Sequence, residues 1–336
     1  MQASAPSSSR AVLVRSTPHG QVQASDFEVA EAPLPELADG DVRIRVDVLS
    51  LDPYLRSLLG PGHLGEPAVG PGAVMPGRAI GTVTLSRHPD VPEGSQVLAE
   101  TGWRTEAVVA GDATTPVSVP AGVPASAVLG VLGMPGLTAF AVVERHLRPA
   151  AGETIVVTAA TGGVGSLVGQ LARLAGARTV AIVGDEDKAA IAKALGYDAT
   201  VLRGRPGWIE ELHAACPEKI HGYVHMADQE TLDGVVEHLA VGARVSLVGV
   251  IDQNNGAAPT RIRVGALMAA RATTYGMVVY DHADLADAHR ERVGELLARG
   301  EVVALEDAHE GLENAGHAFA ELMAGRNRGK VVVHVS

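Results

Sequence analysis

The chain has 336 residues, of which 46% are hydrophobic and only 3% aromatic, and it carries a formal net charge of −12 at pH 7. This length and hydrophobic content allow two domains with full cores built from Ala, Val and Leu. The acidic balance argues against nucleic acid or an anionic membrane as a partner, since both select clusters of Lys and Arg.

Cysteine content and hydropathy favour a cytoplasmic protein. The single cysteine, Cys216, excludes an internal disulfide and a thiolate-rich metal site, which fits a reducing compartment. Residues 1–10 are rich in Ser and Ala and lack the apolar core of a signal peptide. No run reaches the roughly 20 apolar residues that a membrane span requires.

Residues 11 to about 120 have the pattern of a small, largely antiparallel, barrel-like domain. Short Val-rich runs such as 42–48 and 79–84 alternate with turns rich in Pro and Gly. The Gly- and Pro-rich segment 60–77 is too long for a simple turn, so we expect a surface loop that borders a substrate site.

A glycine-rich segment at residues 158–170 joins a predicted strand at 154–157 to a predicted helix. The expected apolar stripe of that helix consists of Leu167, Val168, Leu171 and Leu174. A tight turn at this place leaves backbone N–H groups without partners at a helix N-terminus, where the pyrophosphate of a dinucleotide can bind.

The glycine spacing, Ala160-x-Gly162-x-x-Gly165, lacks the first glycine of the usual dinucleotide fingerprint. On its own this string also fits a glycine-rich turn that binds nothing. Its surroundings favour the dinucleotide interpretation, because a second apolar run at 179–183, a helix near 188–195 and further alternating elements follow up to about Arg299. Such alternation is typical of a doubly wound parallel sheet.

The helical alternation stops at Glu301, and the chain ends in a predicted strand at 330–335. We expect this strand to return to the first domain, which makes that domain discontinuous.

Several strings of the chain match one known family. They are Leu49-Ser-Leu-Asp-Pro-Tyr-Leu-Arg56, Gly133-Met-Pro-Gly-Leu-Thr138, the glycine turn, Glu310-Gly-Leu-Glu-Asn314 and Gly325-Arg-Asn-Arg-Gly-Lys330. Over nearly its whole length the chain resembles the zinc-free, NADP-dependent alkenal/enone reductases of the medium-chain dehydrogenase/reductase superfamily. This is the family of the prostaglandin reductases (leukotriene B4 dehydrogenases), plant double-bond reductases and bacterial curcumin reductase.

The resemblance implies an α/β fold: a Rossmann-type doubly wound parallel sheet plus a discontinuous GroES-like, mainly antiparallel β-barrel domain. The expected boundaries are 1–125 and 300–336 for the catalytic, GroES-like domain and 126–299 for the NADP-binding domain. Members of the family are commonly homodimers through the nucleotide domain, and the implied partner is a small-molecule substrate with a conjugated carbonyl.

The residues after the second strand of the predicted sheet favour NADP(H) over NAD(H). That strand ends at 182–184 without the carboxylate that usually binds both ribose hydroxyls of NAD. In the resembling family a lysine at the position of Lys188 binds the 2′-phosphate, and Arg203 takes the place of a tyrosine that also contacts it. Arginine can hold phosphate through a bidentate fork, although a solvated Arg203 fits the sequence equally well.

The resemblance assigns further contacts to the cofactor. Met134 and Asn327 match positions that line the nicotinamide and its carboxamide, while Asn327 could instead cap a turn. The complete expected set is Met134, Thr138, Gly162, Gly163, Val164, Gly165, Lys188, Arg203, Val250 and Asn327.

Two nicotinamide reactions fit such a fold, and the residues favour the metal-free one. Zinc alcohol dehydrogenases need Cys, His or Glu ligands early in the first domain, where this chain has Leu51-Asp-Pro-Tyr54. Addition of hydride to an activated carbon–carbon double bond needs only a group that stabilises the enolate oxygen. The resemblance assigns Tyr280 and Tyr54 to the catalytic site, with a half-buried domain-interface role as the alternative for Tyr54.

Two segments depart from the family close to the chemistry. Residues 225–229 are His-Met-Ala-Asp-Gln where the family has Asp-Asn-Val-Gly-Gly, and Asn254 stands where a tyrosine is common. The loss of two glycines restricts the backbone of that loop.

The expected activity is NADPH-dependent reduction of an α,β-unsaturated ketone or aldehyde. Quinone reduction, a redox-neutral cyclase or isomerase, and nucleotide binding without catalysis are the alternatives.

Overall fold

The computed structural model describes residues 8–60 and 62–335. Its contacts divide the chain into two compact units. Unit 2 consists of Pro120–Val123 and Gly130–Glu306, and unit 1 consists of the described residues before, between and after these two stretches. The chain first enters unit 2 at Pro120, returns to unit 1 over 124–129, leaves it again at Gly130 and re-enters it at Asp307. The sequence-based boundaries were 125/126 and 299/300.

Unit 2 is built around a parallel sheet of six strands in the order β10-β9-β8-β11-β12-β13. The strands are β8 (Thr154–Thr158), β9 (Arg178–Val183), β10 (Ala199–Leu202), β11 (Ile220–His225), β12 (Leu239–Leu247) and β13 (Thr273–Gly276). All five residues of β8 are buried, as expected for a strand of a parallel sheet covered on both faces. The strand order reverses beside β8, which is where ligands bind in open sheets of this kind.

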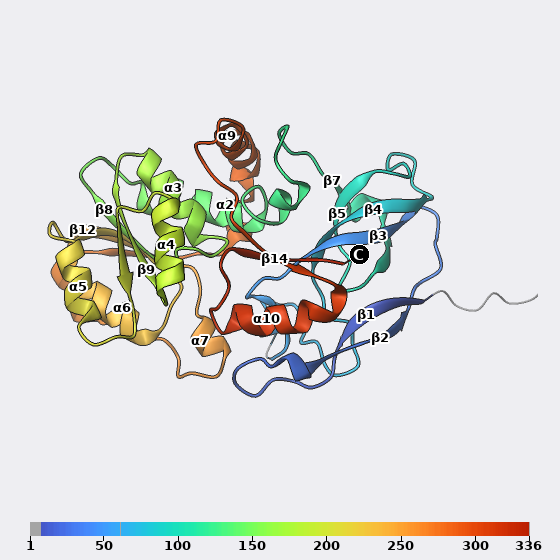
Figure 1. Cartoon of the computed structure of the whole chain (residues 1–336), viewed down its shortest axis with the longest axis horizontal. Helices are drawn as coiled ribbons and strands as arrows, with labels where there is room; N and C mark the ends of the chain where they lie inside the picture. The colour runs from blue at the N-terminus through green and yellow to red at the C-terminus, as the bar shows by residue number, and fades with distance from the viewer. Residues whose placement is uncertain (1–7, 61, 336) are drawn as a thin grey trace, which may run out of the picture. The chain divides into compact units, whose positions relative to one another are not determined.

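Helices connect the strands of this sheet. The bounds are α2 (Met134–Ala141), α3 (Gly165–Leu174), α4 (Glu186–Ala194), α5 (Trp208–Ala215), α6 (Gln229–Val236), α7 (Ile251–Asn254), α8 (Val264–Ala270) and α9 (Ala286–Ala298), with a π-helical turn η4 (Val142–Leu147) and a 3-10 segment η5 (Val279–Leu285). Helices α3 and α4 pack against β8, β9 and β10 (Figure 1).

The core of unit 2 agrees with the predicted stripe of α3 except at one position. Leu167, Val168 and Leu171 are buried, whereas Leu174 is 38% exposed. Leu174 is the last residue of α3, so its side chain lies past the end of the packed face. The prediction for Leu174 is therefore wrong.

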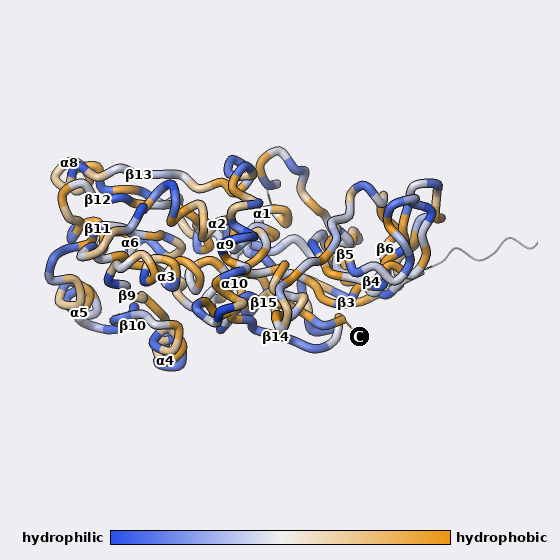
Figure 2. Tube along the Cα trace, turned by 90° about the horizontal axis from the view of Figure 1, so that it is seen from above, coloured by the Kyte–Doolittle hydropathy of each residue, from blue (hydrophilic) through white to orange (hydrophobic). Residues whose placement is uncertain are grey.

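Unit 1 contains a two-stranded sheet, β1-β2, and a seven-stranded sheet with the path β14-β15-β3-β4-β5-β7, in which β6 also pairs with β3. The strands are β1 (Ser8–Val14), β2 (Phe27–Pro33), β3 (Asp41–Ser50), β4 (Arg78–Ser86), β5 (Gln96–Glu100), β6 (Glu106–Ala110), β7 (Thr115–Pro116), β14 (Glu306–Glu310) and β15 (Lys330–His334). Buried residues alternate with more exposed ones along the first part of β3. Figure 2 shows the trace of the chain coloured by the hydropathy of each residue.

The C-terminal strand returns to unit 1, as predicted, because β15 pairs antiparallel with β3. Helix α10 (Ala315–Met323) accompanies it and places Phe319 against Phe27 and Trp103, with ring centroids 6.0 and 5.5 Å apart. The remaining helical pieces are α1 (Leu55–Leu58), η1 (Ala24–Asp26), η2 (Gly111–Ala113), η3 (Ala125–Leu129) and η6 (Leu312–Asn314). The parallel sheet of unit 2 and the mainly antiparallel strands of unit 1 confirm the predicted fold class.

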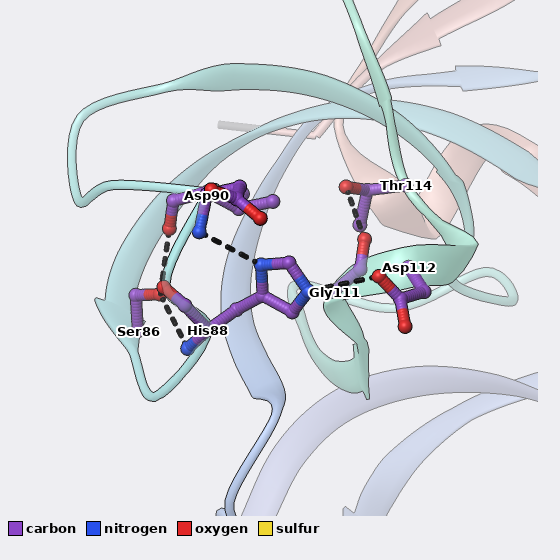
Figure 3. Close-up of polar contacts among 7 residues, drawn as sticks. Ser86, His88, Asp90, Gly111, Asp112 and Thr114 are labelled. Atoms are coloured by element: carbon purple, nitrogen blue, oxygen red, sulfur yellow. Dashed lines mark hydrogen bonds and ion pairs between the residues drawn. The ribbon is translucent and has the colours of Figure 1, made fainter.

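Hydrogen bonds centred on His88 connect the turn after β4 to the segment after β6 (Figure 3). The His88 Nδ1 accepts a hydrogen bond from the Asp90 N–H at 3.1 Å, so Nε2 carries the proton of the neutral ring and donates to Asp112 at 2.9 Å. A Cβ on Gly111 would lie 2.5 Å from the His88 ring, so only glycine lets the imidazole pack at this position.

Candidate functional site

The predicted glycine turn starts with an unusual backbone conformation directly after β8. Ala159 has a φ of 47°, in the left-handed region that non-glycine residues rarely adopt. Its carbonyl accepts a hydrogen bond of 2.9 Å from the Gly162 N–H. The strand therefore ends abruptly, and α3 begins six residues later at Gly165.

Gly165 allows the helix to start against the backbone that it has just left. A Cβ on this residue would lie 2.4 Å from the Ala159 carbonyl oxygen and 2.9 Å from the Ala160 Cα. One turn later, the ring of Tyr197 occupies the space beside Gly169, and its hydroxyl donates to the Gly165 carbonyl at 2.7 Å. Helix α3 is thus fixed by close contacts on two sides of its first turns.

This arrangement fits an anionic group at the start of α3. In the described part of the chain, no hydrogen bond uses the N–H groups of Gly163, Val164 and Gly165 as donors. The Ser166 hydroxyl, in the same turn, is buried without a hydrogen-bond partner among the described residues. N–H groups without an acceptor in the chain and the positive end of the helix dipole favour a phosphate here. The sequence interpretation did not identify Ser166.

Lys188 lies in the first turn of α4, beside the end of β9. Its N–H donates to the Asp185 carboxylate at 2.8 Å, so Asp185 caps α4, in keeping with a role at the helix N-terminus. The Lys188 residue is only 8% exposed. Because β9 and β10 are neighbours in the sheet, Lys188 and Arg203 follow adjacent strands at the same edge.

Arg203 has a partner that the sequence interpretation missed. Its N–H donates to the Val183 carbonyl at 3.0 Å, and its guanidinium forms an ion pair with Asp228, beyond β11. The same carboxylate caps α6 by accepting from the Thr231 N–H at 2.8 Å. Burial raises the pKa of Asp228, but the hydrogen bonds from Thr231 and the charge of Arg203 outweigh it and hold the pKa below its ordinary value.

The remaining predicted cofactor residues of unit 2 lie on other elements. Met134 opens α2, and the Thr138 hydroxyl donates to the Met134 carbonyl at 2.9 Å. Val250 directly precedes α7 and lies three residues after the end of β12. Tyr280 lies in η5, shortly after β13, and is 52% exposed.

Two predicted site residues belong to unit 1. The ring centroid of Tyr54 lies 5.1 Å from that of His63. The Asn327 side chain donates to the Gly329 carbonyl at 2.8 Å. This bond is the turn-capping role that the sequence left open as the alternative for Asn327.

Segment 225–229, which differs from the family sequence, forms a compact network of polar contacts. His225 is fully buried, and its Nδ1 lies 2.8 Å from the Tyr223 hydroxyl, while Nε2 has no partner in the described structure. The Met226 N–H donates to the Thr158 hydroxyl at 2.7 Å. Gln229 accepts from the Arg261 N–H at 2.7 Å and donates to its carbonyl at 2.8 Å. The segment therefore links β8, β11 and the loop after α7.

Comparison with known proteins decides the family. A model described as the N-terminal domain of oxidoreductase matches residues 10–117, and one described as zinc-binding dehydrogenase matches residues 163–293. The NADPH-dependent curcumin reductase of Escherichia coli (strain K12) is 32% identical over 332 residues, 96% of each chain. The chain belongs to the zinc-free enone reductases of the medium-chain dehydrogenase/reductase superfamily.

Two further relatives of this reductase support the assignment. The 2-alkenal reductase (NADP(+)-dependent) of Nicotiana tabacum is 31% identical over 98% of each chain. The crystal structure of CurA in complex with NADPH from Vibrio vulnificus is 32% identical, covers 97% of this chain and 99% of its own, and superposes with a TM-score of 0.91. The predicted NADP(H) cofactor and oxidoreductase class are thus confirmed.

Two searches of the structure bear on other kinds of site. Among residues 8–60 and 62–335, no group of three or more His, Cys, Asp or Glu side chains is arranged to hold a metal ion. No helix in the described part of the chain is both long and apolar enough to cross a membrane.

The close approach at Gly165 predicts a specific loss of cofactor binding. In Gly165→Ala, the new Cβ must push the Ala159 carbonyl away and open the turn, at a cost of about 1–3 kcal/mol. We expect NADPH affinity, measured by isothermal titration calorimetry, to fall roughly tenfold or more. Gly265→Ala is the matched control, because nothing lies within 4 Å of its added Cβ. Equal NADPH affinity in the two variants would contradict this role for Gly165.

The buried His225 predicts a pH dependence of stability. Burial lowers the pKa of this imidazole to about 4, with a partial offset from Asp228. As the pH falls from 6.5, the unfolded chain binds a proton that the folded chain excludes until about pH 4, which lowers the free energy of unfolding by about 3 kcal/mol.

His225→Asn removes this titration while offering Tyr223 a hydrogen-bonding group near the position of Nδ1. Urea unfolding at several pH values should show a smaller loss of stability between pH 6.5 and 4 in the variant than in the parent. Parallel curves for the two proteins would show that His225 is not the titrating group.

Proposed function

We propose that this reductase transfers hydride from NADPH to the β-carbon of α,β-unsaturated ketones and aldehydes and so reduces their carbon–carbon double bond. The observation that carries the proposal is full-length similarity, at 31–32% identity, to a curcumin reductase and a 2-alkenal reductase. Curcumin and 2-alkenals share a double bond conjugated to a carbonyl group, which is the substrate class that we propose.

In this proposal the residues of unit 2 hold the cofactor. The N–H groups of Gly163, Val164 and Gly165 bind the pyrophosphate at the start of α3, and Lys188 and Arg203 bind the 2′-phosphate beyond β9 and β10. Met134, Thr138 and Val250 are assigned to the nicotinamide half. When bound, NADPH supplies the hydride that the β-carbon accepts.

The chain's own chemical task is to stabilise the negative charge that grows on the carbonyl oxygen. We assign this task to the Tyr280 hydroxyl, which can donate a hydrogen bond to the enolate oxygen, and a substrate-orienting role to Tyr54. A donor for this purpose must be held in place before the reaction. Contacts of η5 with η4 support this assignment: Asp284 forms an ion pair with Arg145, and the His282 Nδ1 lies 3.2 Å from the same guanidinium.

NADPH oxidation across a chemical panel tests the proposed function. We expect loss of absorbance at the nicotinamide band with enones and 2-alkenals and none with the corresponding saturated ketones, because these lack the conjugated double bond. Consumption with quinones alone would identify a quinone reductase. Product formation without NADPH consumption would identify a redox-neutral cyclase or isomerase, and either result would overturn the proposal.

The proposed role of Tyr280 predicts that its hydroxyl affects kcat but not the affinity for NADPH. Tyr280→Phe should lower kcat for an enone by about ten- to hundredfold, while NADPH affinity stays unchanged, since the hydroxyl acts on the substrate oxygen. Tyr275→Phe, which removes a hydroxyl from nearby β13, is the control and should keep the parental kcat. An unchanged kcat in Tyr280→Phe would remove Tyr280 from the mechanism.

A further inference from the structure

The ion pair between Arg203 and Asp228 lies across the edge of the sheet at which the cofactor binds. Arg203 directly follows β10, and Asp228 lies three residues after β11. In the sheet order β10-β9-β8-β11, the strands β9 and β8 lie between β10 and β11. The ion pair therefore bridges the carboxyl ends of β9 and β8, where α4 with Lys188 and the glycine turn begin.

The negative charges near the Arg203–Asp228 ion pair disfavour the binding of a phosphate at Arg203. Asp252, in α7, lies close enough to Asp228 to respond to it: burial first, and then the negative charge of Asp228, raises the pKa of Asp252, with Arg203 partly offsetting both. Arg203 therefore pairs with one carboxylate, Asp228, and is influenced electrostatically by a second acid, Asp252. A phosphate group that approaches Arg203 meets competition for the cation and repulsion from an acid.

The two oxygens of the Asp228 carboxylate have separate partners. Oδ1 accepts from the Thr231 N–H and caps α6, while Oδ2 pairs with Arg203. The Asp228–Arg203 pair can therefore open without uncapping α6. The Arg203 side chain is 40% exposed, so its guanidinium can turn toward a ligand at little cost.

We propose that Asp228 is a specificity-determining residue for the cofactor, which competes with the 2′-phosphate of NADPH for Arg203 and thereby narrows the preference for NADPH over NADH. Binding of NADPH exchanges the carboxylate of Asp228 for the phosphate on the guanidinium, whereas binding of NADH requires no exchange. This inference rests on the assignment of Arg203 to the 2′-phosphate made above and does not depend on the substrate that is reduced.

Equilibrium binding of NADPH and NADH, measured by titration calorimetry without substrate, tests the inference. Asp228→Asn keeps a capping side chain for α6 but removes the charge. We expect it to lower the Kd for NADPH roughly three- to tenfold, because the competing ion pair is lost. The Kd for NADH should stay within about twofold of the parent, since NADH lacks the 2′-phosphate.

A double-mutant cycle shows whether Asp228 acts through Arg203. Arg203→Gln should weaken NADPH binding, and adding Asp228→Asn to it should restore little affinity, because the contested cation is absent. Asp228→Ser, a second capping substitution, should reproduce the gain of Asp228→Asn. Glu237→Gln, which breaks the exposed ion pair with Arg263 elsewhere in unit 2, controls for net charge and should leave both dissociation constants unchanged.

Three results would overturn the inference. NADPH binding that is unchanged or weaker in both Asp228 variants would show that Asp228 does not compete with the phosphate. An equal gain for NADH would show a general effect of charge. Unchanged NADPH affinity in Arg203→Gln would show that Arg203 does not contact the phosphate. Because no substrate is present, none of these outcomes bears on enone reduction.

Discussion

The proposed cofactor site of unit 2 depends on how closely the start of α3 approaches the end of β8. Ala159 turns the chain in a left-handed conformation, and Gly165 then starts the helix where a Cβ would lie 2.4 Å from the Ala159 carbonyl oxygen. The Tyr197 hydroxyl holds the first turn from the other side. With the turn fixed in this way, the N–H groups of 163–165 remain available for a phosphate, and the positive end of the helix dipole adds to their effect. Alanine is accommodated at position 160, where the usual fingerprint has its first glycine, because Ala160 is buried and its φ is not positive.

The acidic charge of the chain is a second constraint on phosphate binding. In a chain with a net charge of −12, the arginines that follow β10 are paired with acids. Arg203 pairs with Asp228, and Arg205, two residues later, meets Glu211 at 2.7 Å and Glu186 at 3.9 Å. A phosphate that binds beside these arginines must compete with carboxylates already present. If Arg203 binds the 2′-phosphate as we propose, the affinity for NADPH depends on the difference between two sets of ion pairs, and Asp228 affects it without touching the cofactor.

Features carried by local patterns could be predicted from the sequence, and those carried by distant side chains could not. The apolar run of β8, the glycine turn and the return of β15 to the first domain each follow from residues close together in the chain, and the structure contains all three. The partner of Arg203 lies 25 residues away beyond another strand, so no spacing rule indicates it. Leu174 fits the helical period but lies at the helix end, where packing rather than periodicity decides exposure. The altered segment 225–229 was recognisable as a departure, yet its bonds to Thr158 and Arg261 depend on the folded sheet.

The fate of the transferred hydrogen tests the central claim, conjugate reduction with NADPH, most directly. NADPH in which both hydrogens at the reactive carbon of the nicotinamide are replaced by deuterium is incubated with the protein and a simple aryl enone, and the product is examined by NMR. Our account predicts a saturated ketone with deuterium on the former β-carbon and a solvent-derived proton on the α-carbon. Deuterium on the carbonyl carbon of an alcohol, or a product without deuterium, would contradict it.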